Sequence, residues 1–275
     1  MPTFDTPGSV SLQIKLPSGR VVVTTAEEPK TTVEVVALGR RGQDAMEEIE
    51  ITMDERSGRH VVRVEQRDRF RWGPIQITWG GDFECRVTCP PGTDLELSGA
   101  STNVRVDGEL GEVSARTASG DIRLQGVVGP LQVKTASGDV FVGVVGGQGA
   151  IATVSGDVGI ERIDAALTAR AVSGDITIGS IAAELGISTT SGDVDLKAVL
   201  DGDVRVQTVS GDVRVGVARG TRVWVDAASV SGRLESELGL DDEQAEETEG
   251  GIVPLHVKTV SGDVSVVRAA AALAS

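Results

Sequence analysis

The chain has 275 residues and a formal net charge of −15, with 40% hydrophobic and 3% aromatic residues and no Tyr. That length and apolar content suffice to bury a sizeable core. The acidic balance argues against binding to nucleic acid or to an anionic membrane surface, because both need clustered Lys and Arg. Aromatic side chains commonly line small-molecule pockets, and this chain has few of them, so we expect no cofactor.

The first ninety residues have a strand-like pattern without a fixed period. Runs such as RVVVTT, TTVEVVAL and HVVRVEQ are rich in β-branched residues. We predict an N-terminal β region over residues 1–90 that caps the first rung of the following domain, because an open stack exposes unpaired strand edges. The sequence shows neither a leader peptide nor a long apolar run, which predicts a cytoplasmic protein without membrane insertion.

The only two cysteines are Cys85 and Cys89, in the strand-like run CRVTC. On an extended strand they would lie roughly 13 Å apart along one face. That separation is too long for a disulfide without a bend. The pair therefore favours a reduced, cytoplasmic setting.

Aromatic and basic residues gather near the end of this β region. Two interpretations stay open: the aromatics pack as part of the cap, or they form a surface that binds a protein partner together with the neighbouring arginines. The candidate partner-binding patch consists of Arg67, Arg69, Phe70, Arg71, Trp72, Trp79 and Phe83.

From residue 91 onward the sequence repeats itself. The tripeptide Ser-Gly-Asp recurs at first every 18 residues and then at intervals of 19 and more, with the variant Ser-Gly-Arg at Ser231. Self-similarity at this period predicts stacked repeats. The tripeptides begin at Ser119, Ser137, Ser155, Ser173, Ser191, Ser210 and Ser261.

Within each unit, counting Ser as position 1, apolar residues recur at positions 4, 6, 9, 13 and 15. Alternation with a period of two predicts short strands, and nothing recurs at helical spacing. An 18-residue unit cannot close its own core, but units stacked about 4.8 Å apart can bury a continuous column. We predict an all-β parallel β-solenoid over residues 91–268. One unit shows the pattern in Ile176, Ile178, Ile181, Leu185 and Ile187.

The repeated tripeptide is predicted to form the corner of each rung. Gly takes the positive φ of a tight corner without steric cost, and the Asp side chain bonds the backbone of its own corner. Threonines two places before Ser should stack as an inward or corner row of hydroxyls, which Ala171 interrupts. The threonines are Thr117, Thr135, Thr153, Thr189, Thr208 and Thr259. The structural corners are Gly120, Asp121, Gly138, Asp139, Gly156, Asp157, Gly174, Asp175, Gly192, Asp193, Gly211, Asp212, Gly262 and Asp263.

The column of aspartates raises the question of a metal. Calcium-binding β-roll repeats carry Gly and Asp at much shorter spacing. Here each 18-residue unit offers one carboxylate. The pattern therefore favours a structural corner, and we expect no metal ion.

Near the C-terminus the spacing between Ser231 and Ser261 is 30 residues, 12 more than the basic unit. The excess forms an acidic insertion over residues 235–252, which is predicted to bulge out as a solvated loop. A second interpretation is an acidic docking segment. Residues 269–275 are predicted to form a C-terminal tail or cap.

No catalytic residues are predicted. A serine nucleophile needs an adjacent base, and the chain has only His60 and His256. His256 lies between two strand residues and is expected to point outward. A glycosidase needs two carboxylates in a groove, and the repeats lack the aromatic platforms that hold sugars.

The segment around Val87, Pro90, Gly92, Leu95 and Leu97, followed by the Ser-Gly-Asp units, resembles a bacterial family of uncharacterised domains labelled "putative adhesin". The resemblance covers most of the chain, from about Val10 to Val266. It implies a β-solenoid built from degenerate repeats, and some members belong to cell-envelope stress systems. The lack of an export signal departs from what a surface adhesin needs.

These observations leave three classes of function. The first is a non-enzymatic structural or protein-binding module with an unknown protein partner, present as a monomer or small oligomer. The second is a self-assembling filament, as in bactofilin-like solenoids. A polysaccharide-active enzyme is a distant third. Capped ends would favour the module, because polymerisation needs exposed strand edges.

Overall fold

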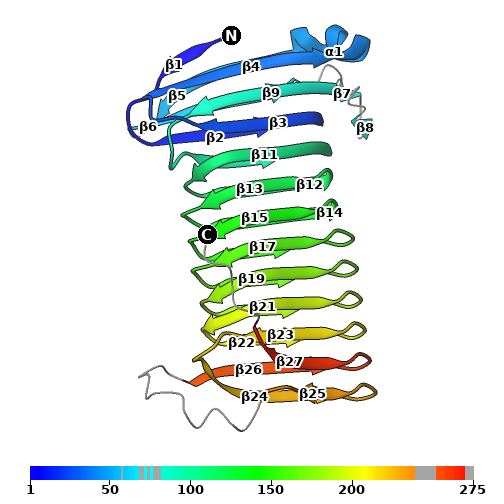
Figure 1. Ribbon diagram of the computed structural model, residues 1–275. Helices are drawn as coiled ribbons and strands as arrows, with labels where there is room; N and C mark the ends of the chain where they lie inside the picture. Colours follow the sequence, from blue (N-terminus) through cyan, green and yellow to red (C-terminus); the bar gives the residue numbers. More distant parts are fainter. Residues whose placement is uncertain (57, 68–70, 73–74, 77–81, 239–251, 270–275) are drawn as a thin grey trace. The chain divides into compact units, whose positions relative to one another are not determined.

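The computed structural model describes the 275-residue chain apart from residues 57, 68–70, 73–74, 77–81, 239–251 and 270–275 (Figure 1). Two compact units make up the chain, Met1–Phe141 and Val142–Ser275. The described part is all-β except for one short helix, α1 (Gly39–Ala45), and the 3-10 turn η1 (Met46–Glu48). The predicted parallel β-solenoid is confirmed.

In the first unit, the repeats form rungs of two strands that pair in parallel with the next rung. Val104 pairs with Ile122 and Val113 with Leu131, an offset of 18 residues in both cases. The sequence period is therefore the register of the sheet. The strands are β10 (Asp94–Ser98), β11 (Ser101–Leu110), β12 (Val113–Ser119), β13 (Ile122–Val127) and β14 (Leu131–Ser137), followed by β15 (Val140–Val145), which continues into the second unit.

Part of the N-terminal region belongs to the same stack. The strands β2 (Val10–Lys15) and β3 (Ser18–Thr25) form a rung that pairs in parallel with β10 and β11. Their other edges pair in parallel with β6 (Arg59–Gln66) and β9 (Asp82–Cys89). The predicted boundary at residue 90 is therefore corrected. The period is lost there because neighbouring rungs in space are not neighbours in sequence.

Antiparallel strands pair with the outer edges of β9 and β6, which form the outermost rung of this unit. The strand β4 (Lys30–Leu38) pairs antiparallel with β9 and with β1 (Thr3–Asp5). The strand β5 (Ile49–Arg56) pairs antiparallel with β6. A short antiparallel pair, β7 (Arg71–Trp72) and β8 (Ile75–Gln76), follows β6 in sequence.

The second unit is also built of two-strand rungs, with a core of Val, Ile and Leu. The five residues that define the predicted pattern, Ile176 to Ile187, are all at most 3% exposed. The strands are β16 (Gly149–Ala152), β17 (Val158–Ile163), β18 (Leu167–Arg170), β19 (Ile176–Ala182), β20 (Leu185–Ser188), β21 (Val194–Asp201), β22 (Val204–Gln207) and β23 (Val213–Val217).

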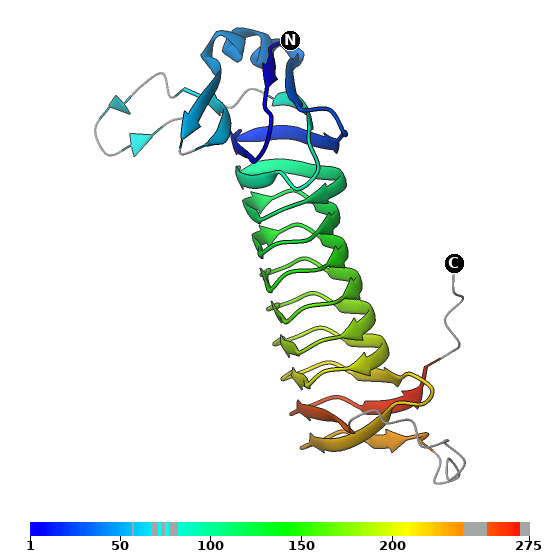
Figure 2. The same cartoon turned by 90° about the vertical axis from the view of Figure 1, so that its left-hand side faces the viewer.

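The last rungs are stacked out of sequence order (Figure 2). The strand β26 (Ile252–Thr259) pairs with β22 on one side and with β24 (Arg222–Ser229) on the other. Likewise β27 (Val264–Arg268) lies between β23 and β25 (Leu234–Ser236). The predicted loop over residues 235–252 falls largely outside the described residues, and in sequence it joins β25 of the outermost described rung to β26 of an inner one.

Candidate functional site

The Ser-Gly-Asp corners are packed so closely that a side chain at Gly would collide with the previous rung. A Cβ at Gly192 would lie 2.2 Å from the carbonyl oxygen of Gly174, and a Cβ at Gly174 would lie 2.3 Å from that of Gly156. The predicted positive φ holds at Gly120, where φ is 116°. Close approach of stacked backbones is therefore a second reason for glycine, which the sequence pattern alone does not reveal.

Each corner aspartate links two rungs. The Asp193 Oδ1 atom accepts a hydrogen bond from the backbone N–H of Asp212 at 2.8 Å, and Asp175 accepts one from Asp193 at 2.9 Å. The prediction that each Asp bonds its own corner is therefore wrong. Each such hydrogen bond to a carboxylate oxygen offsets part of the repulsion between neighbouring charges along the column. The same bond joins Asn103 to Asp121, Asp121 to Asp139, Asp157 to Asp175, and Asp212 to Asp263.

The column also explains the single Ser-Gly-Arg variant. The Asp263 Oδ1 atom accepts the backbone N–H of Arg233 at 2.7 Å. Arg233 belongs to the outermost rung. Within the described ranges no rung lies beyond it, so no backbone N–H could donate to a side-chain acceptor at position 233. An Asp there would have no corner to hold, so the variant marks the end of the stack in space although another repeat follows in sequence.

The predicted row of inward threonines is confirmed. All six are between 4% and 8% exposed, and Ala171, at 6%, occupies the interrupted position. The Thr117 hydroxyl donates to the carbonyl oxygen of Ser119 at 2.7 Å. The row therefore packs inside the corner and offers no surface for a ligand.

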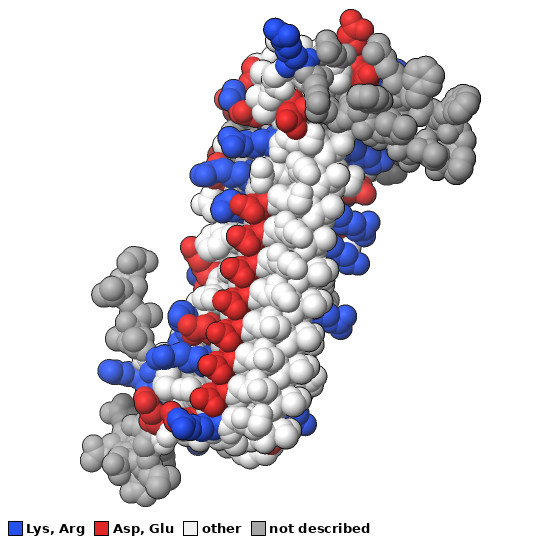
Figure 3. Space-filling view, turned by 90° about the vertical axis from the view of Figure 1, so that its right-hand side faces the viewer, with Lys and Arg blue, Asp and Glu red and all other residues white. Residues whose placement is uncertain are grey.

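The residue just before the Ser of each Ser-Gly-Asp corner faces solvent. In the second unit this position forms a valine row, which we define as Val154, Val172, Thr190, Val209 and Val260. Its four valines are between 47% and 50% exposed. Figure 3 shows an uncharged strip beside the column of acidic residues on this edge. An exposed apolar row on successive rungs indicates an interaction surface.

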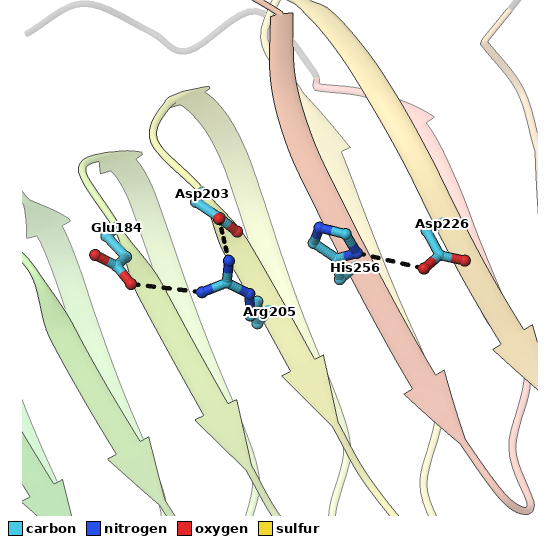
Figure 4. A network of polar contacts seen from close by, with 5 residues as sticks. All are labelled: Glu184, Asp203, Arg205, Asp226 and His256. Atoms are coloured by element: carbon cyan, nitrogen blue, oxygen red, sulfur yellow. Dashed lines mark hydrogen bonds and ion pairs between the residues drawn. The ribbon is translucent and has the colours of Figure 1, made fainter.

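A polar network lies on the outward face of the last rungs (Figure 4). Arg205 contacts Asp203 and lies 3.6 Å from Glu184, while the His256 Nδ1 atom is 3.4 Å from Asp226. His256 points outward as predicted and also meets the Trp224 ring edge-on, with centroids 5.3 Å apart. Partly exposed pairs of this kind add little to stability.

The candidate patch in the N-terminal region is only partly described. Phe83 is fully buried in β9, so it belongs to the core and its place in an exposed patch is corrected. Alternation along β9 directs it inward. Arg67 is exposed and pairs with Glu50. Arg69, Phe70 and Trp79 lie outside the described residues, as do the side chains of Arg71 and Trp72.

The first unit has a shallow polar hollow lined by Ser11, Arg59, Asp94, Glu96 and Glu112. Arg59 pairs with Asp94 at 2.8 Å, and the Asp94 Oδ1 atom accepts the backbone N–H of Glu112 at 2.8 Å. The Asp94 carboxylate is thus already engaged by Arg59 and by the Glu112 backbone, so the hollow is a weak candidate for a site.

Both cysteines are free and buried, which agrees with the prediction that they do not form a disulfide. Burial raises the pKa of the Cys85 thiol to about 12 and that of Cys89 to about 11. Thiols with such pKa values stay protonated and unreactive at neutral pH. In the part of the chain that the structure describes, no group of three or more His, Cys, Asp or Glu residues could hold a metal ion.

Comparison with known protein families identifies the family of this chain. The family model described as Toastrack DUF4097 matches residues 10–217 and 173–267. The chain belongs to the Toastrack DUF4097 family. This match begins at residue 10, in agreement with a solenoid that includes β2 and β3. No curated protein matches the Toastrack chain, and among its described residues no helix is long and apolar enough to cross a membrane.

Three solved structures are similar to this Toastrack chain at low identity. A "putative adhesin" from Parabacteroides distasonis is 13% identical, covering 96% of this chain and 95% of that one, with a TM-score of 0.44. A "putative adhesin" from Bacteroides fragilis is 12% identical over 96% and 95%, with a TM-score of 0.32. A "putative cell adhesion protein" from Clostridium sporogenes is 9% identical over 95% and 93%, with a TM-score of 0.23.

Proposed function

We propose that this Toastrack chain is a non-enzymatic module that binds a protein partner along the valine row of its second unit. The observation that carries the proposal is the exposure of four valines at equivalent positions of the stack. The corner bonds of the Asp column hold these positions in place, so little conformational entropy is lost on binding. Burying the row would remove apolar surface from water, the main favourable term in association.

The charges beside the row indicate the chemistry of the partner. The corner aspartates of the second unit are exposed and run parallel to the valine row. A complementary partner would offer apolar side chains next to a line of Lys or Arg. The net charge of −15 would also steer such a basic partner toward this chain.

The other two classes have less support. The family match does not favour a bactofilin-like filament or a polysaccharide-active enzyme. Arg59 and Asp94 in the polar hollow pair with each other, as do Arg205 with Asp203 and His256 with Asp226, an arrangement that suits structure better than catalysis. The cytoplasmic location expected from the sequence is part of the proposal, and cell fractionation would test it.

Affinity capture from a native lysate with three matched baits tests the proposal. The first bait is the native chain, and the second carries Val172→Lys and Val209→Lys, which place positive charge where a basic partner would dock. The control carries Thr177→Lys and Gln207→Lys, at exposed positions on the outer faces of β19 and β22. Melting temperatures verify that all three are folded.

We expect one set of proteins to be retained by the native and control baits and lost from the valine-row bait, as measured by quantitative mass spectrometry. Equal retention by all three baits would contradict the proposed surface. Absence of specific capture by the native bait would contradict the binding function itself.

A further inference from the structure

Among the described residues, nothing covers the apolar core beyond the outermost rung of the second unit. Val225 stacks on buried Leu255, and Leu234 stacks on buried Val264. Their own exposed fractions are 36% and 52%. Within the described ranges, the pairing of β24 is with β26, and no register joins its other edge to a strand. The predicted C-terminal cap over residues 269–275 falls almost entirely outside the described residues.

We infer that the free edge of β24 pairs antiparallel with β24 of a second copy of this chain, with Trp224 at the two-fold axis. The strand begins Arg-Val-Trp-Val-Asp, residues 222–226. Antiparallel pairing centred on Trp224 puts Arg222 of each copy opposite Asp226 of the other. It also puts Val223 opposite Val225. The segment is thus complementary to itself in both charge and polarity.

The faces of the strand agree with this pairing. Val223 and Val225 lie in register with the buried residues Val253 and Leu255, so they point along the core column. Arg222, Trp224 and Asp226 alternate with them and point outward. Residues directly opposite in an antiparallel pair share a face, so the ion pairs would form outside and the valine pairs inside.

A second copy suits this edge better than an unrelated strand. A two-fold interface requires a patch that complements itself, which the order of charges in β24 provides. Val225 and Leu234 are apolar core residues, and in the inner rungs the residues at equivalent positions are covered by the next rung. Pairing of two copies occupies residues 222–226 of this edge, and in the first unit antiparallel β4 and β5 pair with the outer edges of β9 and β6, so we expect assembly to stop at a dimer.

Charge exchange across the pair tests the inference. Arg222→Asp alone places Asp opposite Asp at both symmetric positions, and Asp226→Arg alone places Arg opposite Arg. The double exchange restores opposite charges in reversed order, and an equimolar mixture of the two single variants restores them between different chains. Arg214→Asp, on the exposed face of the inner strand β23, is the matched control.

Sedimentation equilibrium is the measurement. For the native chain and the control we expect a species of twice the 28.5 kDa chain mass, with a dissociation constant raised at least tenfold in each single variant. The double exchange and the mixture should regain the dimer, which a merely folding-related loss would not do. Val225→Lys should give a monomer with unchanged circular dichroism.

Three results would overturn the inference. They are a native chain of 28.5 kDa at every concentration, single variants that do not regain the dimer when mixed, and open-ended growth of the native chain. The residues involved are separate from the valine row, so the dimer and the partner-binding proposal succeed or fail independently.

Discussion

At the residue scale, the corner glycines are constrained by their neighbours in the stack. Gly192 has no space for a Cβ, which would lie 2.2 Å from the Gly174 carbonyl oxygen. We expect Gly192→Ala to lower the free energy of unfolding by about 1–3 kcal/mol, the usual range for overpacking. Gly186→Ala is the control, because the nearest atom to its Cβ would be 3.8 Å away. Urea denaturation compares the two variants, and equal losses of stability would contradict the close backbone packing inferred at Gly192.

The corner carboxylates give a second prediction at this scale. Asp193→Asn keeps an oxygen acceptor for the N–H of Asp212 and removes one charge from the column, so its melting temperature should be unchanged or slightly raised. Asp193→Ala removes the acceptor and should cost about 1 kcal/mol. Millimolar calcium should change neither the native chain nor the Asn variant. A large calcium-dependent rise in the native melting temperature, lost in Asp193→Asn, would identify a metal site instead.

At the element scale, the register of each strand decides which substitutions are tolerated. Ile178 in β19 is fully buried, and its neighbour Thr177 is exposed. Ile178→Asp would bury an unpaired carboxylate, and we expect a loss of several kcal/mol or failure to fold. Thr177→Asp should change stability by less than about 0.5 kcal/mol. Thermal unfolding followed by circular dichroism compares the two, and similar losses would show that the register is wrong.

The strands that could be predicted from the sequence are those whose neighbours in space are one period apart. For β17 to β23 the apolar positions and the corners follow directly from the repeat. The rungs at both ends were missed because β2 and β3, like β26 and β27, are inserted between rungs that are distant in sequence. One signal was available: Arg233 replaces the corner Asp, which indicates a rung that no further rung follows.

The candidate site was predictable only in part. The corner residues and the threonine row could be found from the repeat. The valine row was not predicted, because the alternation of apolar and polar residues in a strand does not extend to the residue beside a corner. The sequence therefore does not show whether that side chain faces the core or the solvent. The self-complementary segment of β24 becomes meaningful only once the outermost rung is known, since any inner strand with the same sequence would have both edges paired.

At the scale of the whole molecule, both ends of the chain are held by interleaved rungs. The pair β26 and β27 lies between earlier strands, so the last strands are paired on both edges and β24 depends on them. A chain ending at Leu238 would lack this rung, and we expect the amides of β24 to exchange with solvent rapidly. Amides of β19 should keep their protection. Hydrogen exchange that left β24 protected in the truncated chain would contradict the observed rung order.

Site-specific photo-crosslinking shows directly whether the valine row contacts a protein partner. A photoreactive phenylalanine derivative replaces Val209 in the row or Gln207 on the outer face of β22, and both variants are irradiated in living cells. The account predicts one discrete crosslinked protein from position 209 and none from position 207. Crosslinks of equal yield at both positions, or no crosslink at position 209, would contradict it.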